Sequence, residues 1–325
     1  MTSATLPLVS FIIPVRDDAR RLQACLASIE QTDYPRRLIE IIVVDNGSVD
    51  HSARVAREAG ALVLSMAKGR VAGLRNAGAA AARGRVLAFV DADHEIGSRW
   101  VHGAIAALSD PAVAGAGLPY SPPPGANWVQ RRYDGLRSHP RAREDAPWLG
   151  SGNLAVKRDA FETLGGFDTS LETCEDVDFC QRLRTAGHRL VAEPDMRSVH
   201  MGDPSSLKAV FFGELWRGRD NLQVTLRGQW TFRHLRSAAV PLVGIAALAL
   251  GAIALASGAP WLAGIAALLL VAPAAIKASS MTRRDPAPSL LHAAQALTVA
   301  FTYDAGRALA PLARAGHRSR RSAEH

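Results

Sequence analysis

The chain is 325 residues long, 48% of its residues are hydrophobic, and its formal net charge is +8. This length accommodates one large α/β domain and an appended segment. Its three cysteines, Cys25, Cys174 and Cys180, are an odd set without zinc-finger spacing, which favours a reducing compartment over a disulfide framework.

The positive charge is concentrated in the last part of the chain. The first 202 residues contain 24 Lys and Arg against 24 Asp and Glu, so the excess comes entirely from residues 203–325. There it flanks a hydrophobic block, with +3 in Asp203–Arg236 and +5 in Lys277–His325. This distribution favours an anionic membrane surface as the partner, and we expect no nucleic acid partner.

Apolar runs with the length of buried strands alternate with segments of helical periodicity. The run at Leu6–Val15 is too short for a signal peptide and lacks a basic flank, so it predicts a first strand. Strands are predicted at Val9–Val15, Ile39–Asp45, Ala61–Ser65, Val86–Asp93, Ala112–Gly117 and Arg189–Ala192. Helices are predicted at Asp17–Gln31, Gly47–Gly60, Gly69–Arg83, Ser98–Leu108, Lys157–Leu164 and Glu175–Ala186. This alternation predicts a largely parallel, doubly wound α/β sheet.

The stretch Val86–Ile96, VLAFVDADHEI, joins a buried strand to a pair of acids. Ligands of open α/β sheets bind at the carboxyl ends of strands, where Asp91 and Asp93 fall. Along extended backbone the two side chains would point the same way. Such a pair suits Mg²⁺ or Mn²⁺ and leaves positions for phosphate oxygens. A lone D-x-D is also common in solvated loops, so its meaning depends on the rest of the chain.

Residues 119–147 are rich in Pro, Gly and Arg, with Trp128 and Tyr133 among charges. They predict a loop-and-helix excursion over the sheet edge, either a recognition element or a surface loop without a special role. Gly150-Ser151-Gly152-Asn153 then leads into a further strand.

Eight fragments in order resemble the family 2 glycosyltransferases, which have the GT-A fold. They cover roughly residues 8–220 and comprise SFIIPVRDD, VVDNGSVD, GLRNAGAAAARG, AFVDADHEI, GSGNLAVKRDAF, LGGFD, CEDVDFCQRLRTAG and VHMG. The resemblance implies inverting transfer of a sugar from a nucleotide-diphospho-sugar donor, with an acceptor-binding half joined to the nucleotide-sugar half. Its nucleotide-sugar-binding positions are Pro14, Arg16, Asp45, Arg75, Asp91 and Asp93. The alternatives are a helix N-terminal acid near Gly47-Ser48 for Asp45 and a surface helix arginine for Arg75.

An inverting displacement needs a carboxylate that takes the proton of the acceptor hydroxyl. CEDVDF supplies three acids at a helix start, where carboxylates also stabilise the first turn. The resemblance places the catalytic base at Asp176, and we interpret Asp178 as structural. Glu175 is expected to orient the acceptor or the base, and Trp148 and Gly152 are the other expected acceptor-binding residues.

His200 in VHMG resembles the histidine that some GT-A enzymes use as a third metal ligand, beside Asp91 and Asp93. A structural histidine is the alternative. The segment ELWRGRDN, with Trp216, Arg217 and Arg219, is expected to close over the diphosphate. It differs from the Q-x-x-R-W signature of processive polysaccharide synthases, which favours addition of one sugar.

Two uncharged runs, Ala238–Ser257 and Trp261–Ile276, are separated by Gly258-Ala259-Pro260. They predict a transmembrane hairpin, with buried core helices as the alternative. Arginines precede the hairpin and Lys277, Arg283 and Arg284 follow it, so the positive-inside rule places both ends and the catalytic domain in the cytoplasm. Ser289–Ala315 is predicted to be an interfacial amphipathic helix, because a third span would carry the basic tail RSRRSAEH across the membrane.

The predicted organisation is therefore a GT-A domain at residues 1–220, a basic linker at 221–237, a hairpin at 238–278, and an interfacial helix with a basic tail at 279–325. The expected acceptor is lipid-linked or membrane-proximal. A nucleotidylyltransferase would also use an acid pair on an α/β sheet, but PVRDDARR is short of glycine for a triphosphate loop. A silent membrane scaffold would not need Asp91, Asp93 and Asp176 together.

Overall fold

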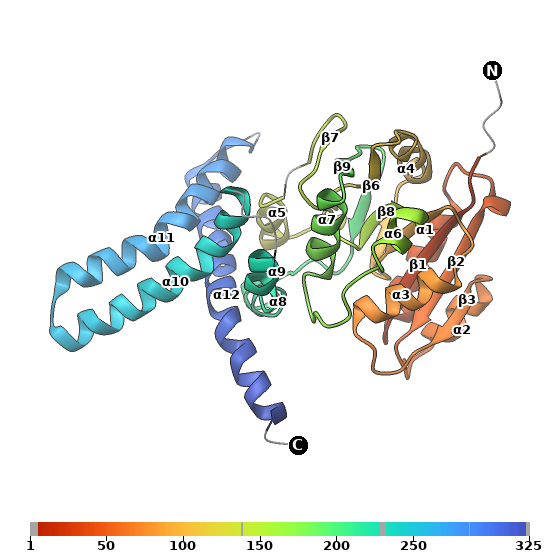
Figure 1. Cartoon of the computed structure of the whole chain (residues 1–325). Coiled ribbons are helices and arrows are strands. Elements are labelled where there is room, and N and C mark those ends of the chain that lie inside the picture. Colours follow the sequence, from red (N-terminus) through yellow and green to blue (C-terminus); the bar gives the residue numbers. More distant parts are fainter. Residues whose placement is uncertain (1–5, 138, 228–231, 286, 323–325) are drawn as a thin grey trace. The chain divides into compact units, whose positions relative to one another are not determined.

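The computed structural model describes residues 6–137, 139–227, 232–285 and 287–322 (Figure 1). The chain divides into two compact units. Unit 1 comprises Met1–Pro123 and Ser138–Gly202, and unit 2 comprises Pro124–Arg137 and Asp203–His325. Part of the Pro- and Gly-rich excursion therefore belongs to unit 2.

Unit 1 is built on an eight-stranded sheet in the order β3-β2-β1-β4-β8-β6-β9-β7. The first four strands are parallel, as the alternation of strands and helices predicted, and the largely parallel α/β class is confirmed. β8 runs antiparallel between β4 and β6. The strands are β1 (Val9–Val15), β2 (Ile39–Asp45), β3 (Leu62–Ser65), β4 (Val86–Val90), β6 (Val113–Gly117), β7 (Glu144–Asp145), β8 (Asn153–Lys157) and β9 (Arg189–Ala192).

The reversed direction of β8 positions the site. Val90 at the end of β4 pairs with Asn153 at the start of β8. The loop that enters β8, Gly150–Gly152, therefore arrives at the sheet edge where β4 ends. Neither periodicity nor strand length in the sequence predicted this pairing.

Helices cover both faces of the sheet because side chains alternate along its strands. On β1, Phe11 and Ile13 belong to the core beneath α1 and α4, whereas Ile12 belongs to the core on the opposite face. That second core contains Phe89 and aromatic rings from around α6 and α7. The helices of unit 1 are α1 (Ala19–Glu30), α2 (Ser52–Glu58), α3 (Val71–Ala81), α4 (Trp100–Leu108), α6 (Arg158–Thr163) and α7 (Glu175–Thr185).

The backbone after β4 differs from the prediction. Extended backbone was expected through Asp93, but the chain turns instead, and the amide of His94 donates to the carbonyl oxygen of Asp91 over 3.0 Å. The turn leads into β5 (His94–Ile96), which pairs antiparallel with β10 (Ser198–His200). His94 lies directly opposite His200 in this ribbon. The alternation argument for Asp91 and Asp93 was therefore wrong.

Unit 2 is helical. Its helices are α5 (Trp128–Asp134), α8 (Leu207–Arg217), α9 (Asn221–Arg227), α10 (Phe232–Ser257), α11 (Pro260–Arg283) and α12 (Leu290–Ser322). α10 and α11 form a hairpin (Figure 1), and Gly258 in its turn has φ +64°, where glycine avoids the strain of a side chain. Residues 228–231 of the predicted linker and 323–325 of the tail lie outside the described residues.

Among the described residues, α11 is the one helix long and apolar enough to cross a membrane. The apolar part of α10, Pro241–Ser257, is shorter. α12 is longer than the predicted interfacial helix and packs against α8, α10 and α11. Two of its charged side chains are paired within unit 2, Asp304 with Lys277 and Arg307 with Glu214, each over 2.6 Å.

Candidate active site

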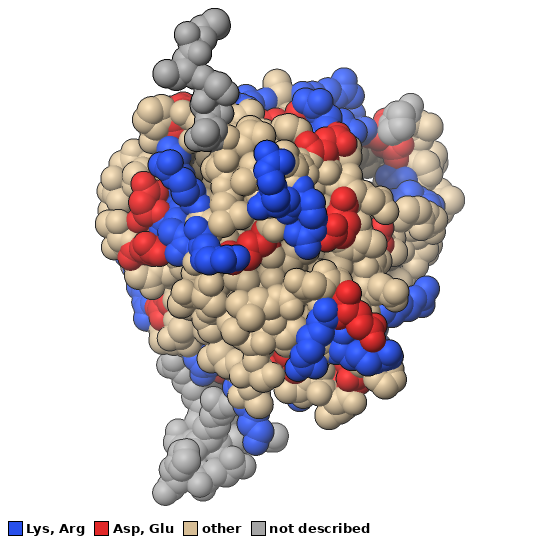
Figure 2. Space-filling model, turned by 90° about the vertical axis from the view of Figure 1, so that its right-hand side faces the viewer, with Lys and Arg blue, Asp and Glu red and all other residues tan. Residues whose placement is uncertain are grey.

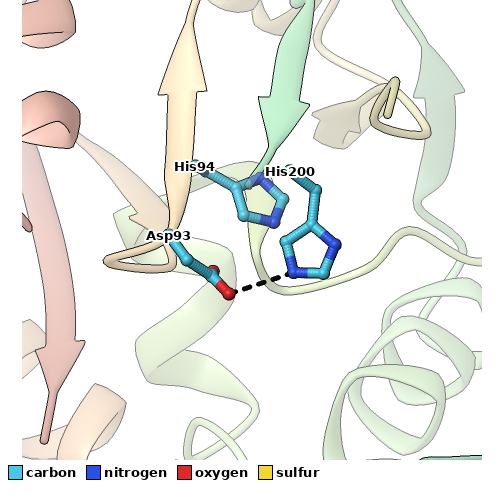
Figure 3. Close-up of side chains that lie close together, drawn as sticks. All are labelled: Asp93, His94 and His200. Carbon is cyan, nitrogen blue, oxygen red and sulfur yellow. Dashed lines mark hydrogen bonds and ion pairs between the residues drawn. The ribbon is translucent and has the colours of Figure 1, made fainter. Parts of the chain in front are cut away.

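A carboxylate and two imidazoles converge where the β5–β10 ribbon meets the turn after β4. Asp93, His94 and His200 each offer a metal-ligand atom, and these atoms lie within 4.8 Å of one another. Figure 3 shows the Asp93 carboxylate directed at His200, whose Nε2 lies 3.1 Å from Oδ2. The ring of Tyr120 packs edge-on against both imidazoles, with centroid distances of 4.9 and 4.6 Å. His94 and Tyr120 were not predicted from the sequence.

Asp93 is held in its charged form. Its burial acts to raise the pKa, but the hydrogen bond and charge of His200, with smaller contributions from His94 and Arg21, outweigh burial and lower the pKa to about 2. An anionic oxygen beside two imidazole nitrogens fits Mn²⁺ or another first-row ion better than Mg²⁺, which prefers oxygen ligands alone.

Asp91 points to a different partner. Its Oδ1 accepts a hydrogen bond from Arg75 Nη2 at 2.5 Å, while Arg75 Nη1 donates to Glu175 Oε1 at 2.7 Å. Arg75 is 3% exposed. The two aspartates of D-x-D therefore diverge, one toward the histidines and one toward a buried arginine.

Two glycines bring the backbone close to the carboxylates of the D-x-D motif. A Cβ on Gly152 would lie 2.6 Å from Asp91 Oδ2 and 3.2 Å from His94 Nε2. A Cβ on Gly202 would overlap the Asp93 carboxylate. Gly152 was predicted to bind the acceptor, and the structure places it close to both Asp91 and His94.

Asp176 lies in the first turn of α7, and the amide of Ser151 donates to its Oδ2 over 3.3 Å. Burial, followed by the negative charge of Glu175, raises the pKa of Asp176 from 3.8 to about 7, although Arg75 acts in the opposite direction. A carboxyl group with this pKa is available both as base and as acid near neutral pH. Asp178, by contrast, pairs with Arg182 one turn along the helix, over 2.8 Å.

Trp148 and Asp176 both lie close to Gly150. A Cβ on Gly150 would be 3.9 Å both from Asp176 Oδ2 and from Cζ3 of Trp148, so the indole and the carboxylate border the same small space. The tryptophan is 52% exposed, so about half of its surface is accessible to a ligand.

The other predicted nucleotide-binding residues lie at the ends of β1 and β2. Pro14 pairs with Val44 in the register of these strands, and Asp45 closes β2 with its Oδ1 accepting the amide of Ser48 over 3.1 Å. Asp45 is buried, and Arg16 is exposed beside Asp17. These positions share the carboxyl edge of the parallel strands with Asp91. Trp216, Arg217 and Arg219 belong to unit 2.

A parallel half, an antiparallel β8 and a ribbon that brings His200 to the D-x-D turn agree with the GT-A fold that the resemblance implied. The sequence model of glycosyl transferase family 2 matches residues 10–165. Glycosyltransferase AglE of Haloferax volcanii is 30% identical over 254 residues, which cover 72% of this chain and 79% of that protein. The chain belongs to glycosyl transferase family 2 and is a glycosyltransferase that uses a nucleotide-sugar donor.

Other relatives agree with this assignment. The pre-mycofactocin glycosyltransferase of Mycobacterium tuberculosis is 33% identical over 207 residues, covering 59% of this chain and 42% of that protein. The mannosyltransferase PcManGT from Pyrobaculum calidifontis, solved with GDP-Man and Mn²⁺, matches with a TM-score of 0.64 at 21% identity over 95% of this chain and 88% of that one. GalNAc-T7, solved with UDP, GalNAc and Mn²⁺, matches with a TM-score of 0.51 at 19% identity over 68% and 52%. The two structures show the shared fold.

Proposed function

We propose that this glycosyltransferase transfers a single sugar, with inversion and with a divalent ion, to a lipid-linked or membrane-proximal acceptor. The observation that carries this proposal is that two groups with different chemistry meet at the Gly150–Gly152 loop. His94 of the Asp93, His94 and His200 group, which suits a cation, lies near Gly152, and Asp176, with a pKa of about 7, lies near Gly150. Donor activation would take place at the first group and acceptor deprotonation at the second.

Asp176 is the proposed general base. It would accept the proton of the acceptor hydroxyl as that oxygen attacks the anomeric carbon from the side opposite the leaving group. The hydrogen bond from the Ser151 amide holds Oδ2 in place. Ser151 also donates its hydroxyl to Glu175 over 3.3 Å, so this loop positions both acids of the motif.

Asp93, His94 and His200 would hold a divalent ion, and these ligands fit Mn²⁺ better than Mg²⁺. When bound, the ion would neutralise the charge that builds on the departing nucleoside diphosphate. The ends of β1 and β2, with Pro14, Arg16 and Asp45, would bind the nucleoside. PcManGT and GalNAc-T7 were both solved with Mn²⁺ and a nucleotide, which supports this assignment.

Trp148 is the proposed contact for the acceptor. Its exposed indole beside Asp176 offers a flat apolar surface on which the apolar face of a sugar ring or a lipid segment can pack while its hydroxyl reaches the carboxylate. Glu175, which accepts a hydrogen bond from Ser151, completes the proposed acceptor side, whereas Gly152 lies beside Asp91 and His94. The absence of the Q-x-x-R-W signature supports transfer of one sugar.

We further propose that the α10–α11 hairpin anchors the protein in a membrane, with the catalytic domain on the cytoplasmic side. Apolar side chains are widely exposed on it, including Leu255 at 88%, Leu268 at 66% and Ile276 at 67%. The basic residues Arg283 and Arg284 close α11, as expected of a cytoplasmic end. By contrast, the face in Figure 2 has basic and acidic side chains interspersed, without a broad area of either sign.

The anchor is tested with a pair of charge substitutions. In the intact protein, membrane sedimentation should withstand alkaline carbonate, whereas a variant with Leu268→Lys and Val271→Lys should be largely extracted, because each lysine in hydrocarbon costs about 2.5–3.5 kcal/mol at the centre of a span. Val49→Lys, at a side chain 93% exposed in unit 1, is the matched control and should leave sedimentation unchanged. Equal carbonate resistance of the double variant would contradict the anchor.

The donor and ion are tested with a panel of nucleoside diphosphates and nucleotide-sugars. One nucleotide should raise the unfolding temperature of the full chain in detergent much more with Mn²⁺ than without it, because a ligand that binds only the folded state stabilises it by mass action. At a concentration 100 times the dissociation constant, the gain is about 2.7 kcal/mol. Nucleoside monophosphates are the control and should give smaller shifts. A response that is the same with Mn²⁺ and with a chelator would contradict the role of the ion.

A further inference from the structure

Arg75 is the residue whose surroundings depart most from its predicted role at the nucleotide. It projects from α3 into the protein interior, where its side chain is 3% exposed. Its two terminal nitrogens are hydrogen-bonded to carboxylates from separate elements, Asp91 after β4 and Glu175 at the start of α7. The face of the Phe167 ring lies 5.9 Å from the guanidinium carbon. A side chain so enclosed offers its charge to its neighbours rather than to a ligand in solvent.

Glu175 and Asp176 are neighbours in the first turn of α7. Arg75 is therefore bonded to the residue next to the proposed base. Titratable groups from two helices interact with the Asp176 carboxylate. α7 contributes Glu175 and Cys180, and α3 contributes Arg75. The thiol of Cys180 is neutral, because burial raises its pKa to about 12. Of these groups, Glu175 is the anion that opposes ionisation of Asp176, and Arg75 is the cation that favours it.

We propose that Arg75 is a positioning residue for the general base: it holds Glu175 in place beside Asp176 and supplies the positive charge that lets Asp176 exist as a carboxylate at neutral pH. This inference rests on the proposed role of Asp176. Without Arg75, two adjacent buried carboxyl groups would compete for ionisation, and like charges at such a distance are not both ionised readily. With Arg75, the anion pair is partly neutralised. The same guanidinium is hydrogen-bonded to Asp91, so one side chain connects the neighbour of the base with the end of β4.

The inference is tested by titrating Asp176 directly. Difference infrared spectra of the full chain in detergent, with Asp176→Asn as the reference for the carboxyl band, give its midpoint of ionisation. In Arg75→Gln this midpoint should move to higher pH by about one unit or more, because an opposite charge at close range changes a carboxyl titration by about 1–3 units. Arg75→Lys, which keeps the charge, should move it less. Arg70→Gln is the matched control, because Arg70 begins the same helix but bonds to the carbonyl oxygens of Thr169 and Ser170.

A second comparison guards against misfolding of Arg75→Gln, which leaves Glu175 buried without its cation. The variant Arg75→Gln with Glu175→Gln removes both charges, and it is compared with Glu175→Gln alone. The midpoint of Asp176 should fall in the single Glu175→Gln variant and should lie higher again in the double variant. Equal midpoints in these two proteins, or an unchanged midpoint in folded Arg75→Gln, would overturn the role of Arg75.

The kinetic profile separates this inference from the proposed function. The acidic limb of kcat/KM against pH should follow the infrared midpoint through the whole series. If the infrared midpoint moves with Arg75 while the limb does not, Arg75 still controls Asp176 but Asp176 is not the base. If neither moves, the Arg75 inference is wrong, whatever Asp176→Asn does to turnover.

Discussion

Asp176→Asn is expected to lower sugar transfer by about 10²–10⁴-fold, the usual cost of losing a general base. Asparagine keeps the shape of the side chain, and its Oδ1 can still accept a backbone amide, but it cannot take the proton of the acceptor hydroxyl. The proposed donor contacts lie at the ends of β1 and β2 and at the Asp93 group. Donor affinity should therefore stay near that of the unaltered protein.

The measurement pairs calorimetry of donor binding with a transfer assay on a membrane lipid extract. Asp178→Asn is the matched control, because Asp178 starts the same helix but pairs with Arg182. It should keep most of the transfer rate. If Asp176→Asn transfers sugar at the full rate, Asp176 is not the base and Glu175 becomes the next candidate.

The stability of Asp176→Asn gives an independent check with a defined sign. In the folded chain the pKa of Asp176 is raised to about 7 from 3.8, so the folded state binds this proton more tightly than the unfolded state. That stabilisation is complete below about pH 4 and is lost as pH rises to about 7. Asparagine has no such loss, so thermal unfolding should show Asp176→Asn more stable than the unaltered protein at pH 8 and similar to it at the lowest pH.

The sequence predicted the parallel half of the sheet closely because each strand there is a continuous apolar run between turn residues. β2 and β9 begin and end where expected, whereas β4 ends at Val90 and not at Asp93 as predicted. The path after Val90 was predicted wrongly because Asp91-Ala92-Asp93 is too short to show a periodicity that distinguishes a turn from extended backbone. The backbone turns there through the hydrogen bond from the amide of His94 to the carbonyl oxygen of Asp91. The next strand, β5, is formed by pairing with β10.

The composition of the site was predictable only where a residue belongs to a local motif. Asp93 and Asp176 stand out in D-x-D and CEDVDF, and His200 stands out in VHMG. His94 becomes part of the cation group through pairing with a strand about a hundred residues later. The contact of Arg75 with Glu175 likewise joins residues 100 positions apart. Such contacts depend on how α3, β4 and α7 pack, which no short stretch of sequence contains.

Asp93→Asn is expected to abolish both sugar transfer and the dependence of nucleotide binding on Mn²⁺. Asp93 supplies the one anionic oxygen among the three proposed ligands, and its low pKa keeps that oxygen charged. Substitution of groups that merely orient ligands costs about 10–100-fold in metal affinity, so loss of the anionic ligand should cost at least about 100-fold. The measurement is Mn²⁺ titration by electron paramagnetic resonance, beside nucleotide-diphosphate binding with and without the ion.

Glu95→Gln is the matched control for this variant. Glu95→Gln removes the same charge two residues further along, in β5. The side chain of Glu95 alternates with that of His94 and so lies on the other face of the β5–β10 ribbon, where Glu95 is paired in register with Val199. It should leave Mn²⁺ binding within about two- to three-fold of the unaltered protein, because a charge on the far face acts only through space. If Asp93→Asn and Glu95→Gln weaken Mn²⁺ equally, the effect is one of general charge, and the cation is not held by Asp93. If Asp93→Asn binds Mn²⁺ normally but transfers no sugar, Asp93 acts on the donor itself. Loss of Mn²⁺ binding in Asp93→Asn alone, with the fold intact by circular dichroism, would place the ion at Asp93, His94 and His200.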